Sequence, residues 1–297
     1  MHEREVGSRL RDNGYVADPS LVSTLWLALE IGRPVLLEGA AGVGKTAVAS
    51  ALAGALGRRL VRLQCYEGLD LQHAVYEWNY GRQLLAIRVH EHDGKLRDEH
   101  DLFSREYLLE RPLLTAIASD IPCVLLIDEI DRADEAFEAY LLEALAEFQL
   151  TIPELGTIRS AVPPVVVLTS NGTRELSDAL RRRCLYHYVE YPSLVREVEI
   201  VRATLPEAEP RLVADAVAFV QRLRREDLQK TPGVAETLDW VRALHRLELK
   251  ALPDDPEVLL KTFGCLLKTR DDRFQLSEQG MRRLLEATAG AGAASGH

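Results

Sequence analysis

The sequence has no long uninterrupted apolar run, and its charged start lacks the apolar core of a signal peptide. No window approaches the roughly 18 consecutive apolar residues that a membrane-spanning helix needs, which argues against a transmembrane protein. Residues 1–5 read MHERE, and they do not begin the apolar core of a signal peptide. We therefore expect a protein that stays in the cytoplasm.

Cysteine is scarce and widely scattered. None of the cysteines Cys65, Cys123, Cys184 and Cys265 belongs to a C-x-x-C pair, so the usual spacing of a zinc site or a redox pair is missing. Each cysteine lies in or beside an apolar run. This favours small buried thiols over reactive or metal-binding ones.

An excess of basic residues is missing as well. The chain has 36 Lys and Arg against 46 Asp and Glu, a formal net charge of −10, which argues against a surface built mainly to hold nucleic acid. Its 297 residues suffice for one large domain, or for one medium and one small domain. The apolar content of 47% is typical of a globular protein.

Residues 34–46 carry the strongest motif of the chain. An apolar run at 35–37 is short enough for a buried strand, the sequence G-x-x-x-x-G-K-T follows from Gly39 to Thr46, and a helical pattern comes next. Strand, loop and helix are the context that this phosphate-binding motif requires. Its glycines let backbone N–H groups face phosphate oxygens, and the helix N-terminus favours an anion. Lys45 can reach the β- and γ-phosphates, and the Thr46 hydroxyl is a natural magnesium ligand. The candidate nucleotide-binding residues here are Gly39, Ala40, Ala41, Gly42, Val43, Gly44, Lys45, Thr46 and Ala47.

Two later apolar strands are expected to end on polar residues. Residues 122–129 end in Asp128 and Glu129, and the strand at 165–169 is followed by Asn171. Buried parallel strands have such apolar sequences, and ligands bind at their carboxyl ends. Asp128 is therefore a candidate magnesium ligand through the water shell of the ion, and Glu129 is the candidate base that activates the attacking water. Asn171 can contact the γ-phosphate or that water; an ordinary Asn-Gly turn is the alternative.

Three consecutive arginines precede the last expected strand, at 186–190. Arg181, Arg182 and Arg183 can complement the dipole of the short helix that they end. Alternatively, one of them presents a cation to the nucleotide of a neighbouring subunit.

The remaining patterns define the domains. A second strand is expected at 59–64, an insertion at about 72–112 and a hairpin at 150–159. Beyond residue 192 only helical patterns occur, at 194–204, 211–225, 234–249 and 256–268. We expect an α/β domain over 1–192, a helical domain over 193–287 and a flexible tail over 288–297. Four residues of the insertion could bind a metal ion, although their spacing matches no recognised site: His90, His92, Asp93 and His100.

Taken together, these residues resemble the AAA+ ATPases, and specifically the MoxR family, over about residues 14–250. The matching segments are the Walker A loop at 39–46, the Walker B segment at 128–131, the sensor-1 Asn171 and an arginine-finger segment at 180–184. The resemblance implies five parallel strands in the order 5-1-4-3-2, a helical lid, bound ATP and Mg²⁺, and a ring, expected to be a hexamer.

The resemblance also implies roles for single residues. Arg183 is the best match to the arginine finger and Arg182 the second. Tyr15 and Val16 lie where relatives line the adenine pocket, although packing in the core is an equal alternative. Where relatives carry a sensor-2 arginine, this chain has Ala235 beside Glu236, so another cation (Lys230 or Arg242) would have to sense the nucleotide.

Within that family, the segments KTPGVAETLDW at 230–240 and EWNY at 77–80 resemble the CoxD-type branch. That branch is linked to maturation of the molybdenum–copper carbon monoxide dehydrogenase, together with a von Willebrand A-domain partner. The leading hypothesis is thus a chaperone that remodels a client metalloenzyme, with Trp78 and Tyr80 of the insertion as candidate client contacts. A nucleic-acid motor and a nucleotide-dependent recruitment switch are the alternatives. A GTP-driven restriction subunit is disfavoured, because TSNG at 169–172 stands where its Met-Asn-x-x-Asp signature is expected.

Overall fold

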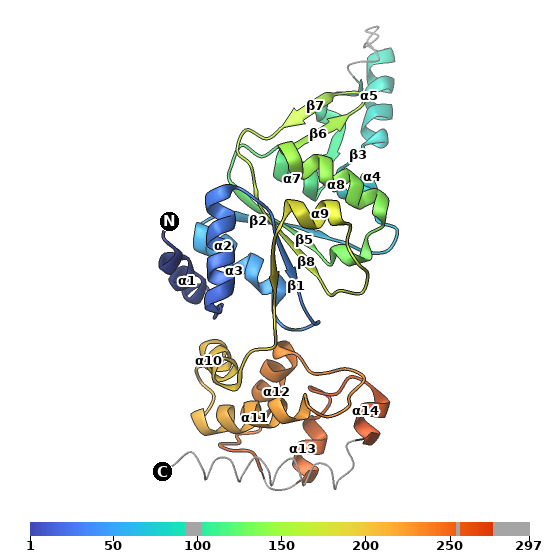
Figure 1. Cartoon of the computed structure of the whole chain (residues 1–297). Coiled ribbons are helices and arrows are strands. Elements are labelled where there is room, and N and C mark those ends of the chain that lie inside the picture. Colours follow the sequence, from blue (N-terminus) through green and yellow to red (C-terminus); the bar gives the residue numbers. More distant parts are fainter. Residues whose placement is uncertain (93–101, 254–255, 276–297) are drawn as a thin grey trace. The chain divides into compact units, whose positions relative to one another are not determined.

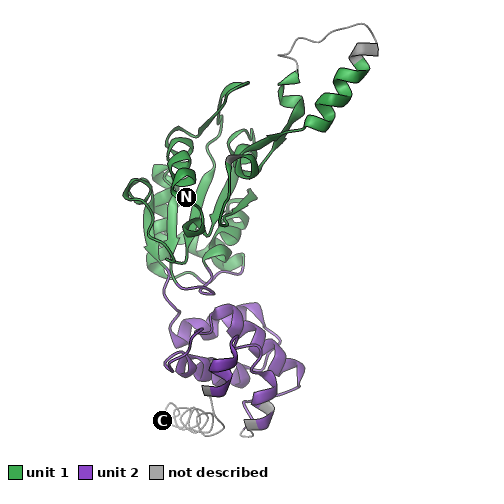
Figure 2. Cartoon of the chain, turned by 90° about the vertical axis from the view of Figure 1, so that its right-hand side faces the viewer, with its two compact units in different colours: residues 1–13, 17–39, 45–188 green, residues 14–16, 40–44, 189–297 purple. Residues whose placement is uncertain are grey.

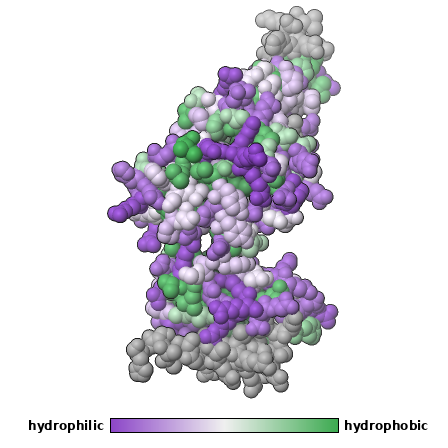
Figure 3. Space-filling model, in the orientation of Figure 1, coloured by the Kyte–Doolittle hydropathy of each residue, from purple (hydrophilic) through white to green (hydrophobic). Residues whose placement is uncertain are grey.

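A computed structural model describes residues 1–92, 102–253 and 256–275. The chain divides into two compact units, coloured separately in Figure 2. Unit 1 comprises Met1–Asn13, Ala17–Gly39 and Lys45–Tyr188, and unit 2 comprises Gly14–Val16, Ala40–Gly44 and the chain from Val189 onward. No helix in the described ranges has the length and apolar character needed to cross a bilayer. On the face drawn in Figure 3, hydrophilic and hydrophobic residues are interspersed over both units.

Five parallel strands form the centre of unit 1, in the order β2-β5-β8-β1-β9 (Figure 1). Their bounds are β1 Val35–Glu38, β2 Arg59–Gln64, β5 Cys123–Asp128, β8 Val165–Ser170 and β9 Leu185–Tyr188. The predicted order 5-1-4-3-2 is confirmed, because it is the same order read from the other edge. The last strand ends at Tyr188, two residues before its predicted end, and Val189 already belongs to unit 2.

Helices cover both faces of this sheet. Figure 1 shows α1, α2 and α3 on one side and α7, α8 and α9 on the other, the arrangement that right-handed crossovers between parallel strands produce. The bounds are α1 Glu3–Asp12, α2 Pro19–Ile31, α3 Lys45–Leu56, α7 Pro112–Ile117, α8 Glu135–Glu147 and α9 Asp178–Arg183. Helix α2 begins at Pro19, where the Asp18 carboxylate caps it by accepting a hydrogen bond from the Leu21 N–H at 2.7 Å. Every residue of β5 is buried, as expected for a central strand between two helical layers.

Two small antiparallel pairs extend from unit 1. The insertion holds α4 Leu71–Ala74, β3 Tyr76–Trp78, α5 Tyr80–His92, the 3-10 turn η1 Arg105–Tyr107 and β4 Leu108–Glu110. Strand β3 pairs with β4, and β6 (Gln149–Ile152) pairs with β7 (Gly156–Arg159). The predicted insertion and the predicted hairpin therefore each contain an antiparallel pair. A further 3-10 turn, η2, spans Ile130–Arg132 after β5.

The two aromatic residues predicted as client contacts differ in exposure. Trp78 is only 6% exposed and packs edge-on against Phe103, with ring centroids 5.2 Å apart. The prediction is therefore wrong for Trp78, which β3 turns into the core of the insertion. Tyr80 begins α5 and is 61% exposed, so it remains available for contact.

In its described residues, unit 2 is helical. The helices there are α10 Leu194–Thr204, α11 Pro210–Leu223, α12 Val234–Arg246, α13 Pro256–Thr262 and α14 Arg270–Gln275. The rings of Phe219, Trp240 and Phe263 form the centre of its core, with centroids 5.2 to 6.3 Å apart. The predicted tail at 288–297 lies outside the described residues.

A buried ion pair joins three helices of unit 2. Glu197 of α10 accepts two hydrogen bonds of 2.6 Å from the guanidinium of Arg224, which follows α11. The same carboxylate accepts from Gln221 at 2.6 Å and from Thr237 of α12 at 2.7 Å. Arg224 also donates to the Pro232 carbonyl at 2.7 Å, so the pair fixes the approach to α12.

Candidate nucleotide site

The phosphate-binding motif connects β1 to α3. Gly42 and Gly44 have φ values of 80° and 99°, in the left-handed region that side-chain-bearing residues rarely adopt. Within unit 2 the Val234 N–H donates to the Gly42 carbonyl at 2.9 Å. A Cβ on Gly233 would lie 2.7 Å from the Gly42 Cα, so this approach of two backbones requires glycine at 233. The backbone conformation of the loop therefore requires glycine at positions 42, 44 and 233.

Lys45, the motif lysine, is almost fully buried at the end of the sheet. Its ammonium donates to the Gly39 carbonyl at 2.7 Å and to the Asn171 side-chain oxygen at 2.8 Å. Burial lowers the pKa of Lys45, and the nearby carboxylates, Asp131 foremost, oppose that shift. The structure therefore brings together two residues that are 126 positions apart in the sequence and that were predicted separately.

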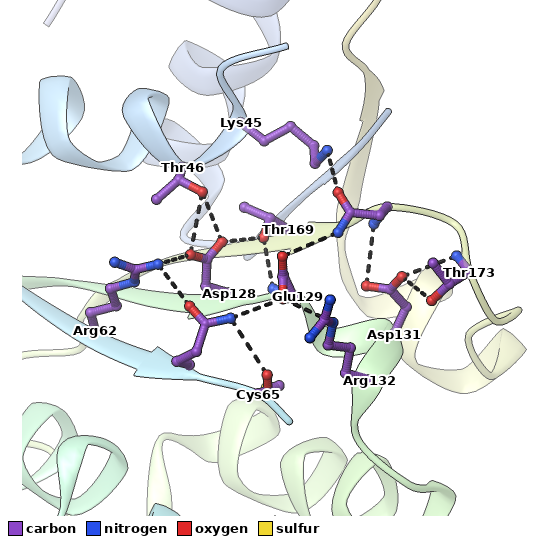
Figure 4. Close-up of polar contacts among 12 residues, drawn as sticks. Lys45, Thr46, Arg62, Cys65, Asp128, Glu129, Asp131, Arg132, Thr169 and Thr173 are labelled. Atoms are coloured by element: carbon purple, nitrogen blue, oxygen red, sulfur yellow. Dashed lines mark hydrogen bonds and ion pairs between the residues drawn. The ribbon is translucent and has the colours of Figure 1, made fainter. Parts of the chain in front are cut away.

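Asp128 lies at the carboxyl end of β5 beside the motif threonine (Figure 4). Its Oδ1 accepts hydrogen bonds from the Thr46 hydroxyl at 3.0 Å and the Thr169 hydroxyl at 2.5 Å, and its Oδ2 accepts from the Arg62 guanidinium at 2.5 Å. A hydroxyl beside a carboxylate supplies the hard oxygen donors that Mg²⁺ prefers, and such sites are completed by substrate phosphates and water. Thr46 and Asp128 therefore fit a magnesium ion.

A site made only of protein ligands is not found elsewhere in the described chain. The described residues contain no group of three or more His, Cys, Asp or Glu side chains placed to hold a metal ion. The side chains of His90, His92, Asp93 and His100 lie outside the described part, so a metal site there remains a prediction.

Glu129 follows β5 in a left-handed conformation, with φ of 55°. Its carboxylate accepts hydrogen bonds from Gln64 at 3.1 Å and Asn171 at 3.3 Å, and it pairs with Arg132 at 3.0 Å. The side chain is still 31% exposed. A carboxylate that is held by donors and remains open to water has the arrangement required of a general base.

Asn171 links Lys45 to Glu129, because its amide accepts from Lys45 and donates to Glu129. Asp131 anchors this loop: it accepts from the Asn171 N–H at 3.2 Å, and from the Thr173 N–H and hydroxyl at 3.0 and 2.6 Å. Burial acts to raise the pKa of Asp131, but these hydrogen bonds outweigh it and hold the pKa below its usual value. The loop position of Asn171, just before Gly172, therefore does not prevent its side chain from contacting Lys45 and Glu129.

The chain matches the model of a known protein family. Residues 34–184, just over half of it, match the family model "AAA domain (dynein-related subfamily)". The chain belongs to this family. The predicted AAA+ membership is confirmed at this level, and the narrower CoxD-type branch stays a prediction.

Relatives of this AAA chain include two haloarchaeal proteins. It is 30% identical over 217 residues to gas vesicle ATPase GvpN1 of Halobacterium salinarum, a match that covers 69% of this chain and 60% of that protein. It is 29% identical over 206 residues to gas vesicle ATPase GvpN of Haloferax mediterranei, covering 66% and 58%. The chain thus spans about three fifths of the length of these relatives. A solved structure, the Thermotoga maritima RuvB Holliday junction branch migration motor, is similar at 20% identity with a TM-score of 0.44, covering 82% of this chain and 66% of that one.

The three consecutive arginines of this AAA domain have different partners. Arg181 pairs with Glu38 at 3.2 Å, and the Arg183 guanidinium donates to the Leu142 carbonyl of α8. Arg182 is exposed, and within the described residues its guanidinium has no hydrogen-bond or ion-pair partner. The structure thus gives three consecutive arginines different surroundings.

Tyr15 and Val16 both lie in unit 2. The Tyr15 ring comes within 3.7 Å of the position that a Cβ on Gly44 would occupy, beside the phosphate-binding motif. Val16 is buried, and its carbonyl accepts hydrogen bonds from Arg196 at 3.2 and 3.3 Å. A contact of these residues with an adenine base remains a prediction.

The sequence analysis assigns no role to several polar residues of the site. Arg62 and Gln64 come from β2, Thr169 from β8, and Asp131 and Arg132 from the turn after β5. The alternation Arg-Leu-Val-Arg-Leu-Gln at 59–64 does indicate a strand with one polar face. It does not indicate which residues of the neighbouring strand that face meets.

Proposed function

We propose that this AAA domain binds Mg-ATP and hydrolyses it to ADP and phosphate. The observation that carries the proposal is the linked set of contacts from Lys45 through Asn171 to Glu129, with Thr46 and Asp128 alongside. The loop amides and Lys45 would hold the phosphates, and Thr46 and Asp128 would hold the magnesium ion, Asp128 through bound water. The ion would neutralise charge on the phosphate oxygens.

Glu129 is proposed as the general base. Its carboxylate takes a proton from a water molecule, whose oxygen bonds to the γ-phosphorus as the bond to the β-γ bridging oxygen breaks. Asn171 orients that water or the γ-phosphate, because its amide lies between Lys45 and Glu129. Gln64 and Arg132 fix the carboxylate from the other side.

The proposal includes a ring in which one subunit supplies an arginine to the nucleotide of the next subunit. By resemblance to the MoxR family, the ring is a hexamer and this arginine finger is Arg183. Arg182 is the alternative finger, because its exposed guanidinium has no partner among the described residues. Replacing the true finger by alanine should leave ATP binding intact and lower turnover by about 10³ to 10⁵. Arg181→Ala is the matched control, because Arg181 already pairs with Glu38 of its own chain. Normal turnover in both Arg182→Ala and Arg183→Ala would remove this cluster from the reaction.

The work driven by ATP is proposed to be remodelling of a client protein. On the resemblance of residues 77–80 and 230–240, the client is a molybdenum–copper carbon monoxide dehydrogenase or a similar hydroxylase, and a von Willebrand A-domain protein takes part. The relatives named gas vesicle ATPases support a second candidate, a role connected with gas vesicles. The net charge of −10 disfavours a nucleic-acid motor, and a recruitment switch that does little mechanical work is the remaining alternative.

One experiment separates these candidates. The Glu129→Gln protein should retain ATP unhydrolysed and hold its partners, so it is purified from its own host with ATP and magnesium, and the bound proteins are identified by mass spectrometry. Lys45→Ala, which should lose nucleotide, is the control. A von Willebrand A-domain protein or a hydroxylase subunit captured only by Glu129→Gln would support cofactor maturation. Gas vesicle proteins would support the second candidate, and bound nucleic acid would overturn both.

A further inference from the structure

Arg62 makes a contact that hydrolysis alone does not require. This residue of β2 donates from one guanidinium nitrogen to Asp128 at 2.5 Å and to the Gln64 side-chain oxygen at 2.7 Å. The two partners differ sharply in exposure: the Arg62 side chain is 53% exposed, whereas that of Asp128 is 3% exposed. A buried carboxylate is thus compensated by a half-exposed cation. Figure 4 shows the Arg62 side chain beside that of Asp128.

The carboxylate of Asp128 is shared between two kinds of partner. Its Oδ1 is the main acceptor for the hydroxyls of Thr46 and Thr169, and its Oδ2 meets the guanidinium of Arg62. A hydrated magnesium ion needs the same carboxylate to accept hydrogen bonds from its water shell. Two cations that rely on one carboxylate repel each other and divide its hydrogen-bonding capacity.

We propose that Arg62 competes with magnesium for Asp128 and thereby sets the magnesium concentration at which nucleotide binds. This inference rests on the magnesium site of the proposed function. Magnesium can replace Arg62 at Asp128, because a half-exposed arginine can turn its guanidinium into water while its aliphatic stem stays against the protein. An exposed cation of this kind gives up little interaction energy when it leaves.

The competition predicts two effects of opposite sign. When magnesium is scarce, Arg62 screens Asp128 from the negative phosphates and so favours nucleotide binding. When magnesium is plentiful, Arg62 opposes the ion at Asp128. A residue that only supported the fold would weaken binding equally under both conditions.

The test measures how a fluorescent, non-hydrolysable ATP analogue binds to the full chain, at free Mg²⁺ from zero (with EDTA) to millimolar. In Arg62→Gln, the free Mg²⁺ at half-maximal binding should fall about twofold to fivefold, the range expected for loss of one partly exposed charged contact. The affinity in EDTA should fall as well. Arg62→Lys keeps the positive charge and should give an intermediate midpoint.

Arg59→Gln is the matched control. Arg59 lies on the same strand and is exposed, but it pairs in register with Cys123 at the start of β5, away from the site. This variant removes the same charge and should keep the wild-type midpoint, and thermal melting confirms that each variant is folded. An unchanged midpoint in Arg62→Gln, or an equal loss of affinity with and without Mg²⁺, would overturn the inference alone. A wild-type protein whose nucleotide binding ignores Mg²⁺ would overturn the magnesium site and the inference together.

Discussion

Asp128 in unit 1 and Glu197 in unit 2 are both buried carboxylates paired with an arginine, but their arginines differ. Arg224 is 7% exposed and contacts both oxygens of Glu197, which is itself fully buried. Arg62 is half exposed and contacts one oxygen of Asp128. Both partners of the first pair are buried, whereas the cation of the second pair is half exposed to water. Removing the arginine therefore leaves a buried carboxylate without its cation in the first pair, and costs less in the second.

The surroundings of the two carboxylates extend this contrast. Glu197 also accepts hydrogen bonds from Gln221 and Thr237, so its neighbours leave no place for a ligand. Asp128 lies at the end of a parallel strand, where Lys45, Glu129 and Asp131 also converge. Charges that gather at the carboxyl ends of strands face the place where ligands bind in such sheets.

The largest stability effect is expected from Arg224→Ala. This change leaves Glu197 buried without its cation, and the free energy of unfolding of unit 2 should fall by about 3 to 5 kcal/mol. Arg62→Ala should cost at most about 1 kcal/mol, because the Arg62 side chain is already half in water and Asp128 keeps its two hydroxyl donors. Urea denaturation of both variants measures the difference. Equal losses would remove the distinction between a fixed and a replaceable cation.

An intermediate effect is expected from Asp131→Asn. Asp131 accepts three hydrogen bonds from Asn171 and Thr173, and an amide nitrogen cannot accept those that its replaced oxygen accepted. The free energy of unfolding should fall by about 1 to 3 kcal/mol. ATP turnover should fall too, because the loop that carries Asn171 loses its anchor. Full turnover in the folded variant would show that Asn171 is positioned by other contacts.

The same carboxylate predicts a smaller effect of pH. The pKa of Asp131 is lower in the folded chain than its usual value of 3.8, so its stabilising contribution is present above that value. The contribution is lost as the pH falls through the folded pKa, when the carboxylate becomes protonated. As the pH falls from about 5 to about 3, the free energy of unfolding should therefore decrease more in the wild type than in Asp131→Asn. Parallel stability curves for the two proteins would contradict this assignment.

The smallest stability effect is expected from Tyr80→Ser in the insertion. Tyr80 is exposed, so the free energy of unfolding should change by at most about 0.5 kcal/mol and ATP turnover should persist. If α5 contacts the client, activation of the client should nevertheless be lost. Trp78→Ala is not a suitable substitute, because Trp78 is a core residue whose loss would unfold the insertion. Unchanged client activation in Tyr80→Ser would place the client contact elsewhere.

Much of the fold could be predicted from the sequence, because apolar runs ending at Asp128 and Asn171 are typical of parallel strands. The polar partners could not be predicted, because they depend on register. Gln64 donates a hydrogen bond to Glu129 because the register of β2 against β5 aligns Gln64 with Asp128. Nothing in the sequence of residues 59–64 specifies that register. The burial of Trp78 could not be predicted, because the sequence of an insertion does not show whether an aromatic residue faces the core or water.

The most direct test of the account is a comparison of ATP binding and single-turnover hydrolysis in Glu129→Gln. Glutamine keeps the size of the side chain but cannot take the proton from water. If Glu129 is the base, Glu129→Gln should bind ATP in magnesium as tightly as the wild type and hydrolyse it about 10² to 10⁴ times more slowly. Hydrolysis at the wild-type rate in this variant would show that Glu129 is not the base, and the central claim would be wrong.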